Sequence, residues 1–287
     1  MEWIKKINHP LNWQEFNLYS ETNQCIEAIN KISPTHIIDF MGQGMVAPSW
    51  EDPLLWYETN ISKKSLLLEN IRNLDSLEKY VRASTPEVYG SNDSLISEKQ
   101  QFNPSTPYAV SHSAIDFHIR CLGKQYEFPY LIGRFANFYG EGQQLYRVIP
   151  RTILSCLTKK QFILDGKGET SRRFIYGEDI VSAIEMLLFK APIQNEYNFS
   201  GDEEITINNL VRLICELTST NFDEIVTFGP ERLGKDMHYR LNCQKSKSQL
   251  EWESKTTLKD GILNVISWID RNKNFLSNES WNYLHLL

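Results

Sequence analysis

Residues 79–90, Lys79-Tyr-Val-Arg-Ala-Ser-Thr-Pro-Glu-Val-Tyr-Gly90, read as a short strand that ends in a polar turn. The β-rich run covers 79–84, and Thr85 and Glu87 follow it directly. In open α/β sheets, ligands bind outside the carboxyl ends of the strands. A hydroxyl and a carboxylate two residues apart at such an end can both face a substrate. We therefore expect Thr85 and Glu87 to border a ligand site.

A second polar pair, Tyr108 and His112, stands at the start of a helix that the pattern predicts from about residue 106. Residues four apart lie on the same helical face, so these two side chains point the same way. We expect the phenol on the helix and the hydroxyl–carboxylate pair at the strand end to converge on one ligand. A cavity between them is the geometric condition on which the functional interpretation depends.

Short β-rich runs alternate with helical patterns around these two segments, which is typical of a parallel sheet with crossover helices. Ser20 is the expected cap of a first helix, and Pro34 ends that helix. A glycine-punctuated loop at Gly42 and Gly44 follows the first strand. The predicted strands are 35–40, 79–84 and 130–135, and the predicted long helices are 53–74 and 106–127.

The second half of the chain has a different pattern, with a turn at 165–168 and a short strand-like run at 174–176. Further helices are predicted from Asp179, over 208–218 and over 260–272. No flexible linker separates the two halves. We therefore expect an α/β parallel-sheet domain over 1–140 and a smaller substrate-binding lobe over 141–287 that returns in part to the sheet.

The composition limits the classes of protein that are possible. The chain has 287 residues and is 41% hydrophobic, so it can bury one large core or two modest ones. Its formal net charge is −6, and it has no basic patch for nucleic acid. Its apolar runs are too short to cross a membrane. Five cysteines without Cys-x-x-Cys spacing indicate reduced thiols. We expect a soluble cytoplasmic protein without a metal, a nucleic-acid partner or a membrane partner.

Several sequence blocks, taken in order, resemble the extended short-chain dehydrogenases that act on nucleotide sugars, the NAD-dependent epimerase/dehydratase family. The similarity runs from about residue 12 to residue 269, and dTDP-glucose 4,6-dehydratase-like proteins are the most similar members. The blocks are Ser49-Trp-Glu-Asp-Pro53, Ser84-Thr-Pro-Glu-Val-Tyr-Gly90, Pro107-Tyr108, Arg134-Phe-Ala-Asn-Phe-Tyr-Gly140, Arg172-Arg-Phe-Ile-Tyr176 and Glu231-Arg-Leu-Gly-Lys-Asp236.

The resemblance implies that a bound NAD oxidises the sugar at C4 and later returns the hydride. In that scheme Tyr108 removes the proton of the C4 hydroxyl, and Thr85 hydrogen-bonds the same oxygen. Glu87 takes the C5 proton, and loss of the C6 hydroxyl completes a 4,6-dehydration of a nucleoside-diphosphate hexose. A 4-epimerase and a UDP-glucuronate decarboxylase are the alternatives within this class of enzyme.

The same resemblance implies the binding residues and the assembly. Arg172 and Arg232 bind the diphosphate, where guanidinium groups suit phosphate oxygens, and Asn137 contacts the substrate. The residues expected beside the cofactor are Phe40, Met41, Gly42 and His112. We also expect a homodimer in which the predicted helices 53–74 and 106–127 pack against a second subunit as a four-helix bundle.

The sequence departs from the family pattern in three places. None of the 14 glycines forms the Gly-x-x-Gly-x-x-Gly turn that holds the NAD pyrophosphate, so we expect a Rossmann-like sheet that is incomplete at its N-terminus. His112 replaces a lysine whose charge, about 4 Å away, is worth roughly 4 kcal/mol to a phenolate at an effective dielectric constant near 20. Pro86 replaces the acid that protonates the departing C6 oxygen in many 4,6-dehydratases.

These departures leave other interpretations open. The chain is then a truncated product, a protein completed by a partner chain, or a catalytically impaired protein that binds sugar nucleotides and has lost NAD.

Overall fold

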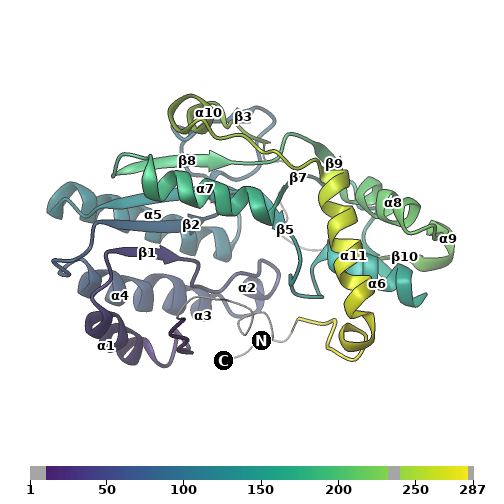
Figure 1. Ribbon diagram of the computed structural model, residues 1–287, viewed down its shortest axis with the longest axis horizontal. Helices are drawn as coiled ribbons and strands as arrows, with labels where there is room; N and C mark the ends of the chain where they lie inside the picture. The colour runs from purple at the N-terminus through teal and green to yellow at the C-terminus, as the bar shows by residue number, and fades with distance from the viewer. Residues whose placement is uncertain (1–10, 232–239, 284–287) are drawn as a thin grey trace.

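The structure, a computed structural model, describes residues 11–231 and 240–283. Its main sheet has four parallel strands in the order β1 (His36–Asp39), β2 (Lys79–Ser84), β4 (Tyr130–Phe135) and β8 (Asn195–Phe199) (Figure 1). All six residues of β4 are buried, as expected for a central strand covered on both faces. The expected α/β fold with a Rossmann-like parallel sheet is confirmed.

Helices cover both faces of this sheet. One face packs on α1 (Thr22–Ile32), α4 (Lys64–Ile71) and α5 (Pro107–Tyr126), through buried residues such as Tyr80 and Ile132. The other face packs on α7 (Gly177–Phe189), which crosses in front of the strands in Figure 1. Alternation along the strands therefore divides the apolar side chains between two cores.

Most of the strands and helices predicted from the sequence are confirmed, with two corrections. Ser20 is not a helix cap, because α1 begins at Thr22 and the main-chain N–H of Ser20 instead donates to the Asn17 side chain at 3.4 Å. The predicted helix 53–74 is not continuous. It consists of α3 (Pro53–Tyr57), a π-helical segment η2 (Glu58–Lys63) and α4.

The small lobe lies beside the carboxyl ends of the main strands (Figure 1). It contains α6 (Val148–Thr158), α8 (Ile207–Leu217), α9 (Phe222–Ile225), α11 (Leu258–Leu276) and the parallel pair β6 (Phe162–Asp165) and β10 (Val226–Gly229). A three-stranded sheet, β5 (Asn137–Tyr139), β7 (Ser171–Tyr176) and β9 (Glu204–Thr206), joins it to the main sheet. The remaining elements are α2 (Pro48–Glu51), the 3-10 turn η3 (Pro86–Tyr89), β3 (Leu95–Ile96), β11 (Arg240–Leu241) and α10 (Gln244–Leu250).

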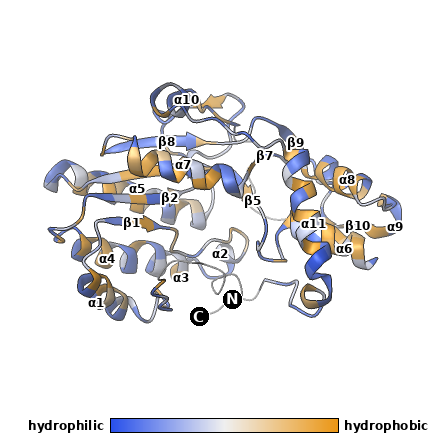
Figure 2. Ribbon diagram, viewed as in Figure 1, coloured by the Kyte–Doolittle hydropathy of each residue, from blue (hydrophilic) through white to orange (hydrophobic). Residues whose placement is uncertain are grey.

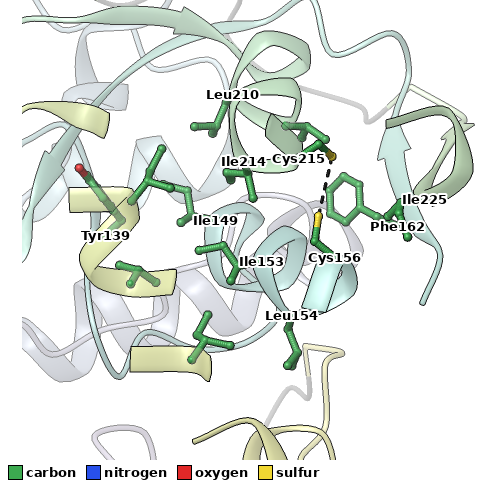
Figure 3. Packing of buried hydrophobic residues seen from close by; sticks show 14 of the residues in the cluster. Tyr139, Ile149, Ile153, Leu154, Cys156, Phe162, Leu210, Ile214, Cys215 and Ile225 are labelled. Carbon is green, nitrogen blue, oxygen red and sulfur yellow. Dashed lines mark hydrogen bonds between the residues drawn. The ribbon is translucent and has the colours of Figure 1, made fainter. Parts of the chain in front are cut away.

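The small lobe has its own apolar core, in which α6 packs between α8 and α11. Figure 2 shows hydrophobic and hydrophilic residues alternating along α8 and α11, as in amphipathic helices that cover a core. Ile153 and Leu154 of α6 lie in this core with Ile214 of α8 (Figure 3). The Sγ atoms of Cys156 and Cys215 lie 3.7 Å apart in the same cluster.

Replacing Ile153 by alanine should destabilise the protein strongly, since its side chain is fully buried. The expected loss in the free energy of unfolding is about 2–5 kcal/mol, because the change removes apolar contacts and leaves a cavity. Val181→Ala on the exposed side of α7 is the control and should change stability by no more than about 0.5 kcal/mol. Denaturant titrations of both variants give the two values, and similar losses would contradict this description of the core.

Candidate active site

A cavity of about 500 Å³ opens where the main strands end, between the sheet and the small lobe. Segments 40–47, 83–87 and 135–139, which follow or end β1, β2 and β4, form much of its wall. All the described candidate residues line it, namely Phe40, Met41, Gly42, Thr85, Glu87, Tyr108, His112, Asn137 and Arg172. Arg232 lies outside the described residues. The geometric condition set from the sequence is therefore met, since Tyr108, Thr85 and Glu87 line the same cavity and Thr85 hydrogen-bonds Tyr108.

Thr85 connects the strand end to the phenol of Tyr108. Its Oγ1 atom accepts from the main-chain N–H of Glu87 at 3.2 Å, which caps the turn η3. The Thr85 hydroxyl also hydrogen-bonds the side chain of Tyr108 and favours its ionised form. Thus one hydroxyl accepts from the turn and still has its proton available for the phenol oxygen.

The local structure at the start of α5 fixes Tyr108. Pro107 is the first residue of the helix, and the Thr106 side chain accepts from the N–H of Ala109 at 3.1 Å. The N–H of Tyr108 donates to Ser49 Oγ at 3.2 Å. These contacts fix the main chain that carries Tyr108 at the N-terminus of α5.

Burial raises the pKa of Tyr108 well above its ordinary value, and the neighbouring Glu87 carboxylate raises it further. The hydrogen bond from Thr85 and the positive charges of Arg147 and Arg82 act in the opposite direction. The Tyr108 phenol is therefore protonated at neutral pH. A base role requires a bound ligand or further positive charge to lower this pKa.

His112 lies beneath Tyr108, with ring centroids 4.5 Å apart. Its Nδ1 atom is 3.0 Å from an Nη atom of Arg82, a residue of β2. Burial, and then the charge of Arg82, lower the pKa of His112 to about 3. His112 is therefore a neutral hydrogen-bonding group in the physiological pH range and not a replacement for the charge of a lysine.

A network of buried ions lies under the cavity. Arg82 bonds to Asp116 of α5 at 3.0 Å, and Asp116 in turn accepts from Arg134 of β4 at 2.9 Å. On the other side, Lys64 of α4 donates to both carboxylate oxygens of Asp39 at 2.7 Å. These five side chains are each no more than 3% exposed. The network therefore ties three strands and two helices together directly below the proposed reacting groups.

The Gly42 loop, which follows β1, is held by Asn60. The Asn60 side chain accepts from the N–H of Gln43 at 2.7 Å and donates to the Gln43 carbonyl at 3.1 Å. It also donates to Ser111 Oγ of α5 at 3.0 Å. Gly42 has φ of +144°, and a Cβ atom there would lie 2.8 Å from Asn60 Oδ1, so this position needs glycine. Asn60 belongs to η2, and π-helical segments are frequent at functional sites.

Two further arginines that the sequence interpretation missed also line the cavity. Arg147 precedes α6 and Arg151 lies in its first turn, and both face the same space as Arg172 of β7. The two arginines lie four residues apart at the start of α6, a basic pair that the sequence did contain. Three arginines around one cavity suit a ligand with several phosphate oxygens.

The residues that line the cavity fit the ribose of a dinucleotide better than its pyrophosphate. Gly42, Tyr108 and His112 provide close main-chain approach and hydrogen-bonding groups for a ribose. Within residues 11–231 and 240–283, no glycine-rich turn leads from a strand into a helix that could hold a pyrophosphate, because the helix after β1 starts at Pro48 and has four residues. The same residues contain no cluster of three or more metal-ligating side chains. Nor is any helix among them long and apolar enough to span a bilayer.

The parallel sheet, the strand-end cavity and the paired Thr85 and Tyr108 define a protein of the extended short-chain dehydrogenase class. Comparison with known proteins agrees. The chain belongs to the NAD-dependent epimerase/dehydratase family, because the family model described as GDP-mannose 4,6 dehydratase matches residues 5–265. The resemblance inferred from the sequence blocks is therefore confirmed.

Individual relatives are distant. A dTDP-glucose 4,6-dehydratase from Haemophilus influenzae is 27% identical over 269 residues, which cover 86% of this chain and 80% of that protein. A trifunctional UDP-glucose 4,6-dehydratase, epimerase and reductase from Arabidopsis thaliana is 26% identical over 94% of this chain. This match spans only 41% of the length of the Arabidopsis protein. The crystal structure of a Bacillus anthracis dTDP-glucose 4,6-dehydratase in complex with NAD has a TM-score of 0.83 and 26% identity, covering 93% of this chain and 83% of that one.

Two neighbouring lysines test the importance of the buried ions. Lys64→Met leaves Asp39 buried without its main partner and should reduce the free energy of unfolding by about 3–5 kcal/mol. Lys63→Met removes a lysine that is 32% exposed and 3.9 Å from Glu58, and should cost no more than about 1 kcal/mol. Denaturant titration at pH 7 measures both values. A double variant with Asp39→Asn should recover part of the loss, and equal costs for the two lysines would contradict the network.

Proposed function

We propose that this protein modifies a nucleoside-diphosphate sugar through a 4-keto intermediate, and that the reaction is a 4,6-dehydration of a hexose. The observation that carries the proposal is the hydrogen bond between Thr85 and Tyr108, placed in the cavity beside Glu87. NAD, when bound, supplies the hydride acceptor for such chemistry. The proposed site residues retain the roles stated from the sequence, with Arg147 and Arg151 added to Arg172 as phosphate-binding groups.

In this proposal Tyr108 accepts the proton of the C4 hydroxyl, and the single hydroxyl proton of Thr85 donates to the same C4 oxygen once the substrate is bound. Because the phenol is protonated at neutral pH, binding of the substrate must first lower the pKa of Tyr108. Tyr108 is already close to the positive charges of Arg147 and Arg82, which act in that direction. Exclusion of water from the cavity by the ligand strengthens these charge effects.

Glu87 is the carboxylate at this strand end that can remove the C5 proton once C4 is a ketone. The C5–C6 double bond forms as the C6–O bond breaks, and the departing oxygen needs a proton to leave as water. Pro86 has no proton to give, so Glu87 passes on the proton that it removed. Both proton transfers of the elimination are then on one carboxyl group. The 4-keto-6-deoxy product further requires a hydride at C6, which bound NAD would return in its reduced form, and a proton at C5, which the Glu87 carboxyl would take up from water and deliver.

Two rival functions remain specific enough to test. A 4-epimerase or a decarboxylase has no departing C6 oxygen to protonate, and Pro86 favours these reactions over dehydration. A sugar-nucleotide-binding protein without activity is favoured by His112, which is neutral where the resemblance implies a charged lysine. The three classes differ in their products, so product analysis separates them.

Incubation of the full chain with NAD and either dTDP-glucose or UDP-glucose should yield a 4-keto-6-deoxy sugar, which absorbs in alkali. Tyr108→Phe should lower the rate by at least about 100-fold, because it removes the proposed proton acceptor. Tyr126→Phe, at the exposed end of the same helix, is the matched control and should leave the rate unchanged. An epimerised product, or release of carbon dioxide from UDP-glucuronate in a parallel incubation, would support the first rival. NAD or nucleotide-sugar binding without turnover would support the second.

We also propose that the protein is a homodimer formed through α3, α4 and α5. Leu54, Leu66 and Val110 expose 74%, 42% and 38% of their surface on these helices. Such apolar side chains on neighbouring helices are typical of a helix-bundle interface.

Light scattering should therefore give twice the chain mass for the natural protein. The double variant Leu66→Glu with Val110→Glu should give the monomer mass, because charges at a buried interface remain unpaired. Phe189→Glu changes an equally apolar side chain, 76% exposed at the end of α7, and should remain dimeric. A monomeric natural protein would refute the proposed assembly.

A further inference from the structure

The contact between Arg82 and His112 fixes where the imidazole carries its proton. A guanidinium group has N–H donors and no acceptor. The Nη atom of Arg82, 3.0 Å from His112 Nδ1, must therefore donate to the lone pair of that nitrogen. Because Nδ1 accepts, a neutral His112 carries its proton on Nε2.

The Nε2 atom of His112 is buried and makes no well-formed hydrogen bond within the described residues. The main chain of Gln43 is the polar group on that side of the ring. Its carbonyl accepts from Asn60 at 3.1 Å and could accept a second hydrogen bond, but its contact with Nε2 does not have hydrogen-bond geometry. His112 is 8% exposed and lines the cavity next to Tyr108. An unsatisfied buried donor costs free energy, and here an acceptor on a bound ligand can satisfy it.

The surroundings of His112 also oppose a second proton on the ring. Arg82 is held by Asp116 at 3.0 Å and lies 3.8 Å from Asp39. The charged groups that influence His112 are Arg82 of β2, Lys64 of α4 and Asp116 of its own helix. The connected network contains three carboxylates and four cations, namely Asp39, Asp116, Glu196, Lys64, Arg82, Arg120 and Arg134. It therefore already carries an excess of positive charge.

We propose that Arg82 is a positioning residue that holds His112 as a neutral Nε2–H donor for an oxygen atom of the bound ligand. The ligand oxygen belongs to a sugar or ribose hydroxyl next to the Tyr108 phenol. Arg82 also keeps a positive charge beside the His112 ring. The ligand part of this inference rests on the proposed function, whereas the protonation state of His112 is a property of the protein alone.

Nitrogen-15 NMR of the full chain with labelled histidine tests the protonation state directly. The chain has six histidines, and His112→Gln identifies the signal of His112. From pH 5 to pH 8, that signal should show a protonated Nε2 and an unprotonated Nδ1, with no titration. A proton on Nδ1, or a titration of His112 within this range, would overturn the inference.

Variants of Arg82 test whether this residue determines which nitrogen of His112 carries the proton. Arg82→Met removes the donor to Nδ1, and His112 should then exchange between its two neutral forms or titrate between pH 5 and pH 8. Arg82→Lys retains a donor and a charge and should restore the form with the proton on Nε2. Arg72→Met, which removes a half-buried arginine paired with Glu69 and outside the network, is the control and should change nothing at His112. If Arg82→Met does not fold, the natural protein and Arg82→Lys still decide, since a lysine variant with a proton on Nδ1 would refute the role of Arg82.

Separate additions of NAD, dTDP-glucose and UDP-glucose test the ligand. At least one of them should shift the Nε2 signal of His112, while the His118 signal on the same helix stays in place. If none shifts it, the ligand-binding role of His112 is wrong, even if the protein converts nucleotide sugars. A shift without any turnover would leave this role supported and would count against the proposed catalytic function.

Discussion

The buried ion network below the cavity is the interaction on which the rest of the site depends. It joins β1, β2 and β4 to α4 and α5 through side chains that water does not reach. Each charge is stable there only because its partners are in place, since a single unpaired ion in the interior is very costly. The relative positions of the strands and helices are thereby fixed at the level where Thr85, Tyr108 and His112 emerge.

The sequence was sufficient to predict the features set by local structure. Strand ends, the start of α5 and the shared face of Tyr108 and His112 depend on neighbouring residues, and these predictions agree with the structure. The Ser20 cap was wrong because the chain before α1 forms a turn in which Asn17 Oδ1 accepts from the N–H of Ser20 and Glu21 Oε2 accepts from the N–H of Asn17. The family resemblance added the expected location of a sugar site, which spacing alone does not give.

Features set by contacts between distant segments were beyond the sequence. Arg82 lies among apolar residues of β2, is 1% exposed and bonds to Asp116 of α5, 34 residues later in the chain. Nothing in the sequence pattern of the strand indicates this contact. The same holds for Asn60, whose partners are Gln43 and Ser111. Such polar contacts form only when segments meet in the folded chain, so propensity and periodicity carry no record of them.

The π-helical segment η2 has a consequence for how the molecule tolerates length changes. A π turn holds one more residue than an α turn, so the helix before Glu58 and the helix after Lys63 are out of phase with a continuous α-helix. Deleting a single residue here would let the helix become regular but would rotate Asn60 by about 100° relative to one of its two flanks. The loop that follows β1 would then lose its anchor, although no group in the cavity had been altered.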